Sequence, residues 1–247
     1  MSAAITFDFH NTIALSDAWF QVEVFDLVGS YLRWRAAEDG DIASEHLVAE
    51  ANAVYRSLRQ AIHHHGHELT SEESIDIVLR RLGIEESPAR IEAGSVAIMR
   101  ETVASAAPVP GVVETIEALH SAGIPLGIVS SAIHHPFLGW CLDAFGLGGR
   151  FSSIVTSASA GYYKTRPEIY WIALRQLDAD PARSVHIGDS FRFDVICGRR
   201  AGLRTVWFAR TDPTKPPVDA PPADATVITM GGIAPLLREQ LALANRR

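Results

Sequence analysis

The chain has 247 residues, of which 47% are hydrophobic, 21% charged and 8% aromatic, as is usual for a folded globular protein. Its 22 basic and 29 acidic residues give a formal net charge of −7, which argues against a nucleic-acid-binding protein and against a protein of anionic membrane surfaces. No apolar run reaches the roughly 20 residues that a bilayer-spanning helix needs. The opening MSAAITFDFH has no basic segment followed by an apolar one, so we expect no signal peptide.

The chain contains two cysteines, Cys141 and Cys197, which lie far apart in the sequence. They form neither a disulfide framework nor the spacing of a cysteine metal site, and a reducing cytoplasm is the expected location. Lysine is also rare, since only Lys164 and Lys215 occur beside 20 arginines. A lysine at a chemically special position is therefore less easily explained by chance.

The first segments of the chain predict a short strand followed by a long helical region. Residues 5–9 form a short apolar run that ends in polar residues, which is typical of a buried strand. From about residue 17 to residue 100, apolar residues recur at helical spacing and predict roughly four helices. Thr70 or Ser71 starts one of them, and Ser87 with Pro88 starts another.

After the breaker sequence Pro108-Val109-Pro110-Gly111, strands and helices are expected to alternate. We expect strands at residues 124–130, 154–156, 184–187, 205–208 and 226–228, and helices at 112–122, 137–145, 167–177, 194–201 and 233–244. The proline-rich residues 210–224 read as an irregular surface loop. Such alternation predicts an α/β fold with a doubly wound, Rossmann-like parallel sheet. The expected core domain comprises residues 1–15 and 108–247, and residues 16–107 form an inserted helical domain.

Polar residues follow four of the predicted strands, where the ligands of open parallel sheets bind. These residues are Asp8, His10 and Thr12 after the first strand, Ser130 and Ser131 after the second, Lys164 after the third, and Asp189 and Asp194 after the fourth. Carboxylate oxygens suit Mg²⁺, and a lysine together with Mg²⁺ would neutralise a phosphoryl group.

In the order and spacing of these four motifs, the sequence resembles the haloacid dehalogenase superfamily. The matching residues are Asp8, Thr12, Ser130, Lys164, Gly188, Asp189 and Asp194. The resemblance covers residues 1–15 and about 108–247, and the insert between the first two motifs resembles the helical cap of one class of the family. The family resemblance implies a Mg²⁺-dependent hydrolase, most simply a phosphatase that acts on a small phosphorylated metabolite.

The same resemblance implies a role for each residue. Asp8 would be the nucleophile and form an aspartyl-phosphate intermediate. The metal would be held by Asp8, the backbone carbonyl of His10, Asp189 and Asp194. The phosphoryl group would be bound by Thr12, Ser130, Ser131 and Lys164, and Lys164 would also restrain Asp8.

His10 departs from the family pattern, because family phosphatases have a second Asp at this position that serves as general acid and base. Histidine can move protons too, with an ordinary pKa of about 6.5. A phosphate dianion nearby should raise the pKa of His10. We therefore expect His10 to replace the missing Asp as general acid and base, the alternative being a hydrogen-bonded spectator.

Two other functions stay open on the sequence alone. A dehalogenase-like hydrolase would turn over without Mg²⁺, although dehalogenases of the family have Tyr at the position of His10. A regulatory protein that binds metal but has lost turnover would bind phosphate analogues without catalysis. A phosphonate-cleaving activity is close to excluded, because it needs a cap lysine and residues 16–107 contain none.

Two further features have simple structural explanations. The run His63-His64-His65-Gly66-His67 reads as a solvated helix end, because adjacent helical histidines point in different directions. Trp19 and Phe20 are expected in the core of the helical insert rather than against a substrate.

Overall fold

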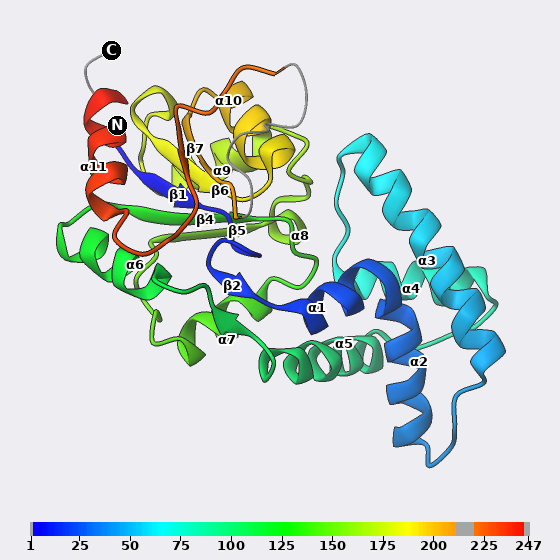
Figure 1. The fold of residues 1–247 in the computed structure, drawn as a ribbon. Coiled ribbons are helices and arrows are strands. Elements are labelled where there is room, and N and C mark those ends of the chain that lie inside the picture. The colour runs from blue at the N-terminus through cyan, green and yellow to red at the C-terminus, as the bar shows by residue number, and fades with distance from the viewer. Residues whose placement is uncertain (1, 211–219, 245–247) are drawn as a thin grey trace.

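A six-stranded parallel sheet forms the centre of the protein, in a computed structural model that describes residues 2–210 and 220–244 (Figure 1). In spatial order, the strands are β5 (Ser153–Thr156), β4 (Leu126–Ser130), β1 (Ile5–Phe7), β6 (Val185–Gly188), β7 (Arg204–Phe208) and β8 (Ala225–Val227). The sheet and its helical insertion confirm the predicted fold class. The predicted loop at 210–224 lies mostly outside the described residues, as does Lys215.

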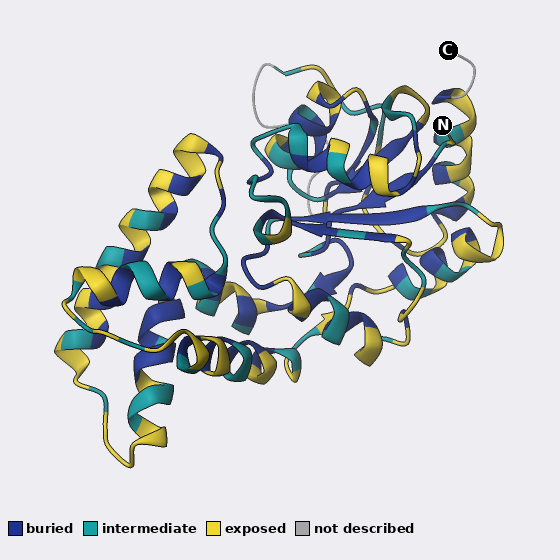
Figure 2. Ribbon diagram, turned by 180° about the vertical axis from the view of Figure 1, so that it is seen from behind, coloured by how far each residue is buried: buried dark blue, intermediate teal, exposed yellow. Residues whose placement is uncertain are grey.

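Helices cover both faces of the sheet, because successive side chains of each strand point to opposite faces. In β4, Ile128 packs in the hydrophobic cluster that includes α6 (Val112–Ser121) and α11 (Ala234–Ala244), whereas Val129 packs against α9 (Glu168–Gln176). Figure 2 shows the central strands as buried along their length. The sheet is therefore a rigid base whose strand ends hold their side chains in fixed positions.

The remaining core elements differ in detail from the prediction. They are α7 (Pro136–Ala144), α8 (Ser157–Ala160), a 3₁₀ turn (Pro181–Arg183), a π-helical turn (Phe191–Cys197) and α10 (Gly198–Arg200). The helix expected at 194–201 is thus a π-helical turn followed by one short α-helix. The strand expected at 5–9 ends at Phe7, because the Phe9 carbonyl turns inward to accept the N–H groups of Ile13 and Ala14 at 2.8 and 2.9 Å.

The helical insertion joins the sheet region through two chain crossings that lie side by side. They form an antiparallel ribbon of β2 (Ala14–Leu15) and β3 (Ala107–Pro108), which the sequence did not predict. Between them lie α1 (Asp17–Gln21), a π-helical turn (Val22–Asp26), α2 (Leu27–Glu38), α3 (Glu45–His65), α4 (Ser71–Arg81) and α5 (Pro88–Val103). The ribbon coincides with the expected domain limits, and the division into two domains stays a prediction.

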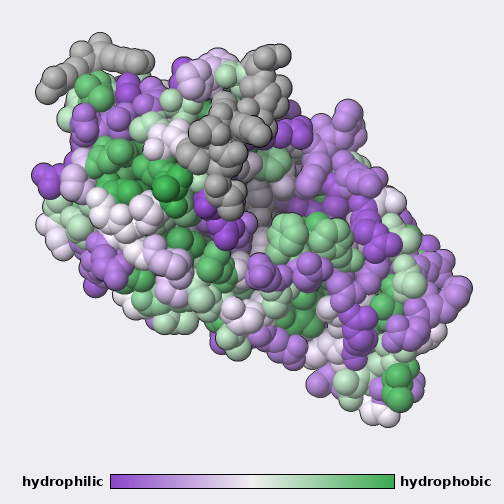
Figure 3. All heavy atoms as spheres, viewed as in Figure 1, coloured by the Kyte–Doolittle hydropathy of each residue, from purple (hydrophilic) through white to green (hydrophobic). Residues whose placement is uncertain are grey.

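Local sequence signals fix the ends of the inserted helices. Thr70 and Glu73 form a reciprocal capping box at the start of α4, and Ser87 caps α5 with Pro88 in its first turn, as the sequence predicted. α3 ends at Gly66, whose positive φ of 73° is easy for glycine. The face of α3 seen in Figure 3 is largely hydrophilic. Among the described residues, no helix combines the length and apolar character needed to cross a membrane.

The inserted helices pack closely at Gly94, where α5 crosses α2. A Cβ atom at this position would lie 2.6 Å from Trp34 Cε3 and 2.6 Å from Tyr31 Cε2, which is closer than atoms can pack. Gly139 in α7 offers the opposite case, because a Cβ there would meet no described atom within 4 Å.

We expect Gly94→Ala to destabilise the protein by roughly 1–3 kcal/mol, because the added methyl group overpacks the α2–α5 contact. The matched control Gly139→Ala should stabilise it by roughly 0.5–1 kcal/mol, since alanine is the better helix former. Urea denaturation of the three proteins measures both changes. If the two variants had equal free energies of unfolding, the contact between α2 and α5 at Gly94 would not be as tightly packed as described.

Candidate active site

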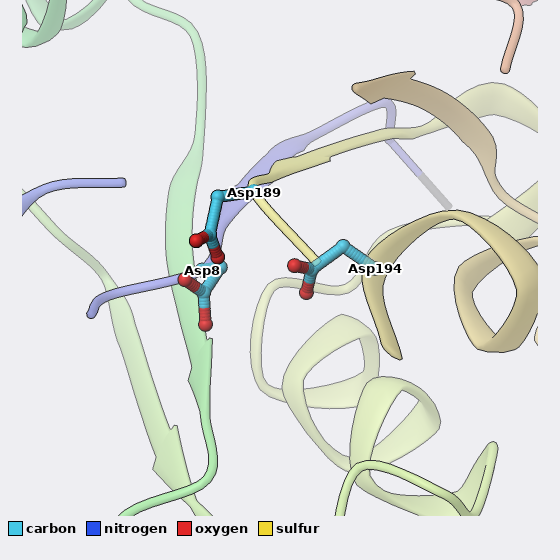
Figure 4. A group of neighbouring side chains, drawn as sticks. All are labelled: Asp8, Asp189 and Asp194. Carbon is cyan, nitrogen blue, oxygen red and sulfur yellow. The ribbon is translucent and has the colours of Figure 1, made fainter. Parts of the chain in front are cut away.

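Three aspartates converge at the carboxyl ends of two neighbouring strands. Asp8 follows β1 and Asp189 follows β6, which pairs directly with β1, while Asp194 comes from the π-helical turn Phe191–Cys197. Figure 4 shows their carboxyl groups pointing toward one another. One oxygen of each lies within 4.8 Å of the other two. The topology therefore builds an oxygen-rich cluster from residues far apart in the chain.

Lys164 lies between two of these carboxylates. Its ammonium group donates to Asp8 Oδ1 at 2.8 Å and also pairs with Asp194 Oδ1, and its side chain is only 3% exposed. A buried ammonium is costly unless it is paired, and here two carboxylates satisfy it. Lys164 thus restrains Asp8, as the family resemblance implies.

Thr12 fixes the second oxygen of the expected nucleophile. Its hydroxyl donates to Asp8 Oδ2 at 2.9 Å and accepts the backbone N–H of Asp189 at 3.1 Å, and the residue is fully buried. Its single hydrogen is therefore given to Asp8, so Thr12 positions the carboxylate. A direct contact between Thr12 and a phosphoryl group stays a prediction.

Asp194 is held by groups that include His186, a residue that the sequence analysis missed. Asp194 accepts from the backbone N–H of Ser190 at 2.8 Å and lies 3.1 Å from His186 Nε2, while His186 Nδ1 is 2.9 Å from Thr6 Oγ1. A histidine within a predicted apolar strand was the available signal. Gly188 completes the arrangement, because a Cβ at this position would overlap the Asp194 carboxyl group.

Burial and mutual repulsion set the protonation of the three aspartates. Burial, opposed by Lys164, raises the pKa of Asp8 to about 6. Burial together with the charges of Asp8 and Asp194 raises the pKa of Asp189 to about 8. Burial also acts on Asp194, but Lys164 and His186 outweigh it and lower the pKa of Asp194 to about 2. The cluster therefore holds more acidic groups than its one lysine can balance.

A divalent cation fits this cluster. Carboxylate oxygens are the ligands that Mg²⁺ prefers, and an added positive charge would offset the repulsion between Asp8 and Asp189. Asp8, Asp189 and Asp194 are the residues that could hold it. The contribution of the His10 backbone carbonyl stays a prediction.

The two serines after β4 occupy different positions. Ser131 lines the cavity above the aspartates, whereas Ser130 is fully buried and is not among its lining residues. Neither hydroxyl has a hydrogen-bond partner among the described residues. Buried hydroxyl groups usually have partners, and of the two only Ser131 faces the cavity, where a ligand oxygen would meet it. Their contact with a phosphoryl group stays a prediction.

His10 lies beside the cluster in an aromatic setting. Its ring stacks on Trp19 with 3.4 Å between centroids, and its Nδ1 is 2.8 Å from Ser16 Oγ. Its Nε2 is buried with no partner among the described residues. Burial and the nearby Lys164 cation lower the pKa of His10 well below 6.5, so the imidazole is neutral near pH 7. The rise in pKa expected beside a phosphate dianion stays a prediction.

The inserted helices form the roof of a cavity of about 370 Å³ above the aspartates. Its polar roof residues include Glu23 from the π-helical turn Val22–Asp26 and Arg59 from α3, both buried. The sequence analysis did not single out either residue. Glu23 follows Trp19 at the i+4 position of one helical face, which was a weak signal, whereas Arg59 carried none.

The minor motifs have mixed outcomes. Trp19 is buried as expected, but it also lines the cavity. The expectation of a core position for Phe20 was wrong, because its side chain is 47% exposed at the cavity, where it meets Phe25. The histidine run ends α3 and is exposed, as expected, and His63 also lines the cavity.

A second attachment joins the insertion to the sheet region close to Lys164. The α3–α4 connector, residues 66–70, pairs antiparallel with residues 161–163 through Glu68 N–H to Gly161 O and Tyr163 N–H to Gly66 O, each at 3.0 Å. The roof of the cavity is thus hydrogen-bonded to the segment that carries the catalytic lysine candidate.

Comparison with known proteins identifies the family. Residues 3–202 match the haloacid dehalogenase-like hydrolase family. The chain is 30% identical over 158 residues to the glyceraldehyde 3-phosphate phosphatase of Methanopyrus kandleri, a match that covers 64% of this chain and 66% of that protein. The chain thus spans slightly less than two thirds of this relative's length. It belongs to the haloacid dehalogenase-like hydrolases.

Solved structures share the fold. The 2-haloacid dehalogenase of Pseudomonas syringae pv. Tomato DC3000 superimposes with a TM-score of 0.67 at 21% identity, covering 98% of this chain and 99% of that chain. The HAD-hydrolase YfnB of Bacillus subtilis, solved with bound magnesium, has a TM-score of 0.60 at 21% identity, covering 96% and 98%.

We expect Mg²⁺ binding to release protons and to strengthen as the pH rises from 6 to 8. Asp8 and Asp189 have raised pKa values and must lose their protons to coordinate the ion, so affinity should rise up to roughly tenfold per pH unit for each proton released. Isothermal titration calorimetry in two buffers of different ionisation enthalpy counts these protons.

Two aspartate variants make this measurement specific. Asp189→Asn should bind Mg²⁺ more weakly and release fewer protons, whereas the exposed Asp178→Asn should behave like wild type. Binding that does not depend on pH would contradict the assignment of these carboxyl groups as ligands.

Proposed function

We propose that the protein is a Mg²⁺-dependent phosphatase that hydrolyses a small phosphate monoester through an aspartyl-phosphate at Asp8. The observation that carries the proposal is the fixed Asp8 carboxylate, held by Lys164 and Thr12 next to Asp189 and Asp194. A carboxylate positioned in this way suits nucleophilic catalysis, and the surrounding charges suit a phosphoryl group. The name of the Methanopyrus relative, a glyceraldehyde 3-phosphate phosphatase, supports a small phosphorylated metabolite as substrate.

The first step forms the bond between Asp8 and phosphorus and breaks the bond from phosphorus to the leaving oxygen. His10 would give a proton to that oxygen, so that the leaving group departs as an alcohol. Lys164, Ser130 and Ser131 would bind the phosphoryl oxygens. Mg²⁺ held by the aspartates would supply further positive charge against those oxygens.

The second step releases phosphate from Asp8. Water attacks the phosphorus and gives its proton to His10, after which the Asp8 carboxylate leaves. A neutral imidazole suits this base role, and with Nδ1–H donated to Ser16 the unpartnered Nε2 is the accepting atom. The acid role requires the imidazolium, which the negative charge of a bound phosphate would stabilise.

Hydrolysis of a generic aryl phosphate, with and without Mg²⁺, tests the proposal first. We expect turnover that requires Mg²⁺ and vanishes in Asp8→Asn, because the amide cannot act as the nucleophile, while the exposed Asp178→Asn keeps wild-type activity. Turnover that survives metal removal would favour a dehalogenase-like hydrolase. Binding of orthovanadate without turnover of any phosphorylated metabolite would favour a regulatory protein.

A leaving-group comparison tests His10. His10→Ala should lower turnover of alkyl phosphates by about 10²–10⁴, the usual range for lost acid–base help. Aryl phosphates should lose less in the first step, because their leaving groups need no proton. Steady-state rates for both substrate types measure this, with the exposed His120→Ala as the matched control. An unchanged rate for alkyl phosphates would contradict the proposed role of His10 as general acid and base.

A further inference from the structure

The roof of the cavity combines an apolar wall with a buried charge cluster. Trp19, Phe20 and Val24 form the apolar part, and Glu23 and Arg59 form the polar part. These side chains stand above the aspartates, where the leaving group of a phosphate ester bound at Asp8 would lie. Their chemistry therefore bears on which leaving group the cavity accepts.

The guanidinium group of Arg59 is already occupied by carboxylates. It donates to both oxygens of Glu68, at 2.5 and 3.4 Å, and its Nη2 lies 3.9 Å from Glu23 Oε1. The side chains of Arg59, Glu23 and Glu68 are 7%, 3% and 0% exposed. Glu68 is held further by the hydroxyl of Ser157 at 2.8 Å and the backbone N–H of Leu69 at 3.0 Å. This bidentate geometry is rigid, and the positive charge of Arg59 is already paired with carboxylates.

Lys164, the other cation of the cavity, is also paired. Its ammonium group forms ion pairs with both Asp8 and Asp194. Burial together with Arg59 lowers the pKa of His63, which keeps that imidazole neutral. Burial raises the pKa of Glu23, so this group is either an anion or a neutral acid and adds no positive charge. Among the described residues that line the cavity, none offers an uncompensated positive charge for a second anionic group.

We infer that the substrate is a monophosphate whose leaving group is uncharged and carries a hydroxyl group, an inference that rests on the proposed phosphatase function. One Glu23 oxygen is bound by the Ile133 N–H at 3.2 Å, which leaves Oε1 beside Arg59 for a hydroxyl group. The carbon chain would pack on Trp19, Phe20 and Val24. A second phosphate or a carboxylate would be buried next to Glu23, with Arg59 already paired to Glu68.

Matched substrate pairs test this inference on the wild-type enzyme with Mg²⁺. Glycerol 1-phosphate and 3-phosphoglycerate share a three-carbon chain, whereas the monophosphate of ethylene glycol and phosphoglycolate share a two-carbon chain. We expect the uncharged member of each pair to have a kcat/KM at least roughly tenfold higher, and pyrophosphate to be a poor substrate. Equal or better turnover of the anionic members would overturn the inference and leave the phosphatase function standing.

Glu68→Gln tests the charge argument directly, because it removes one of the two carboxylates that balance Arg59. We expect the preference to shift at least roughly tenfold toward the anionic members. Glu50→Gln, an exposed glutamate of α3, should leave it unchanged. An unaltered preference in a folded Glu68→Gln protein would overturn the role of this cluster.

If Glu68→Gln does not fold, the binding of the same substrate pairs can be measured instead. Asp8→Asn cannot turn over, so calorimetry can compare its affinity for the two members of each pair, and tighter binding of the anionic members would overturn the inference. Turnover of aryl phosphates with neither member of any pair accepted would also overturn it. No turnover of any phosphate ester, aryl phosphate included, would instead remove the proposed function itself.

Discussion

A buried ammonium group shared by two carboxylates is the constraint on which the site depends. Lys164 is taken out of water, and its charge is tolerable only because Asp8 and Asp194 both lie against it. Removing one member of such a buried cluster typically costs about 3–5 kcal/mol, because the remaining charge has no partner. The parallel sheet meets this constraint geometrically, since the carboxyl ends of β1 and β6 are neighbours and Lys164 reaches them from the loop before α9.

Two buried charge clusters with a similar arrangement lie on opposite sides of the cavity. On the floor Lys164 sits between Asp8 and Asp194, and on the roof Arg59 sits between Glu68 and Glu23. Asp194 and Glu23 both lie on π-helical turns, which bulge a helix and shift the direction of its side chains. The floor carries a further carboxylate, Asp189, and the roof has no counterpart to it among the described residues that line the cavity. Under the proposed function, this extra carboxylate distinguishes the end of the cavity that would hold the metal and the phosphoryl group from the end that would hold a neutral leaving group.

The sequence was sufficient for features with local or regularly spaced signals. The capping residues Thr70 and Ser87, the alternation of strands and helices, and the four motifs at strand ends all follow from short-range patterns. The family resemblance placed Asp8, Lys164, Asp189 and Asp194 together. The β2–β3 ribbon was missed because two-residue strands have no periodicity to detect. The predicted helix at 194–201 was misjudged because nothing local distinguishes a π-helical turn from an α-helix.

The contacts made by Arg59, Glu23 and His186 could not be predicted from the sequence for a different reason. Arg59 and Glu68 are nine residues apart and meet only because α3 ends at Gly66 and the chain reverses. Glu23 reaches the core loop through the Ile133 N–H, 110 residues away in the chain. His186 supports Asp194 through a strand pairing that sets it beside Thr6. These contacts depend on tertiary geometry that neither composition nor spacing contains.

The hydrogen bonds between the α3–α4 connector and residues 161–163 give the insertion a mechanical link to Lys164. Any hinge motion at the β2–β3 ribbon that lifts the roof must break these bonds or carry the backbone of residues 161–163 with it. In the second case, opening the cavity for product to escape would also draw the lysine from Asp8. The contacts that keep the roof over the cavity and the ion pair that holds Asp8 would then have to break together. The rate of product release would therefore depend on how tightly Lys164 is bound to Asp8.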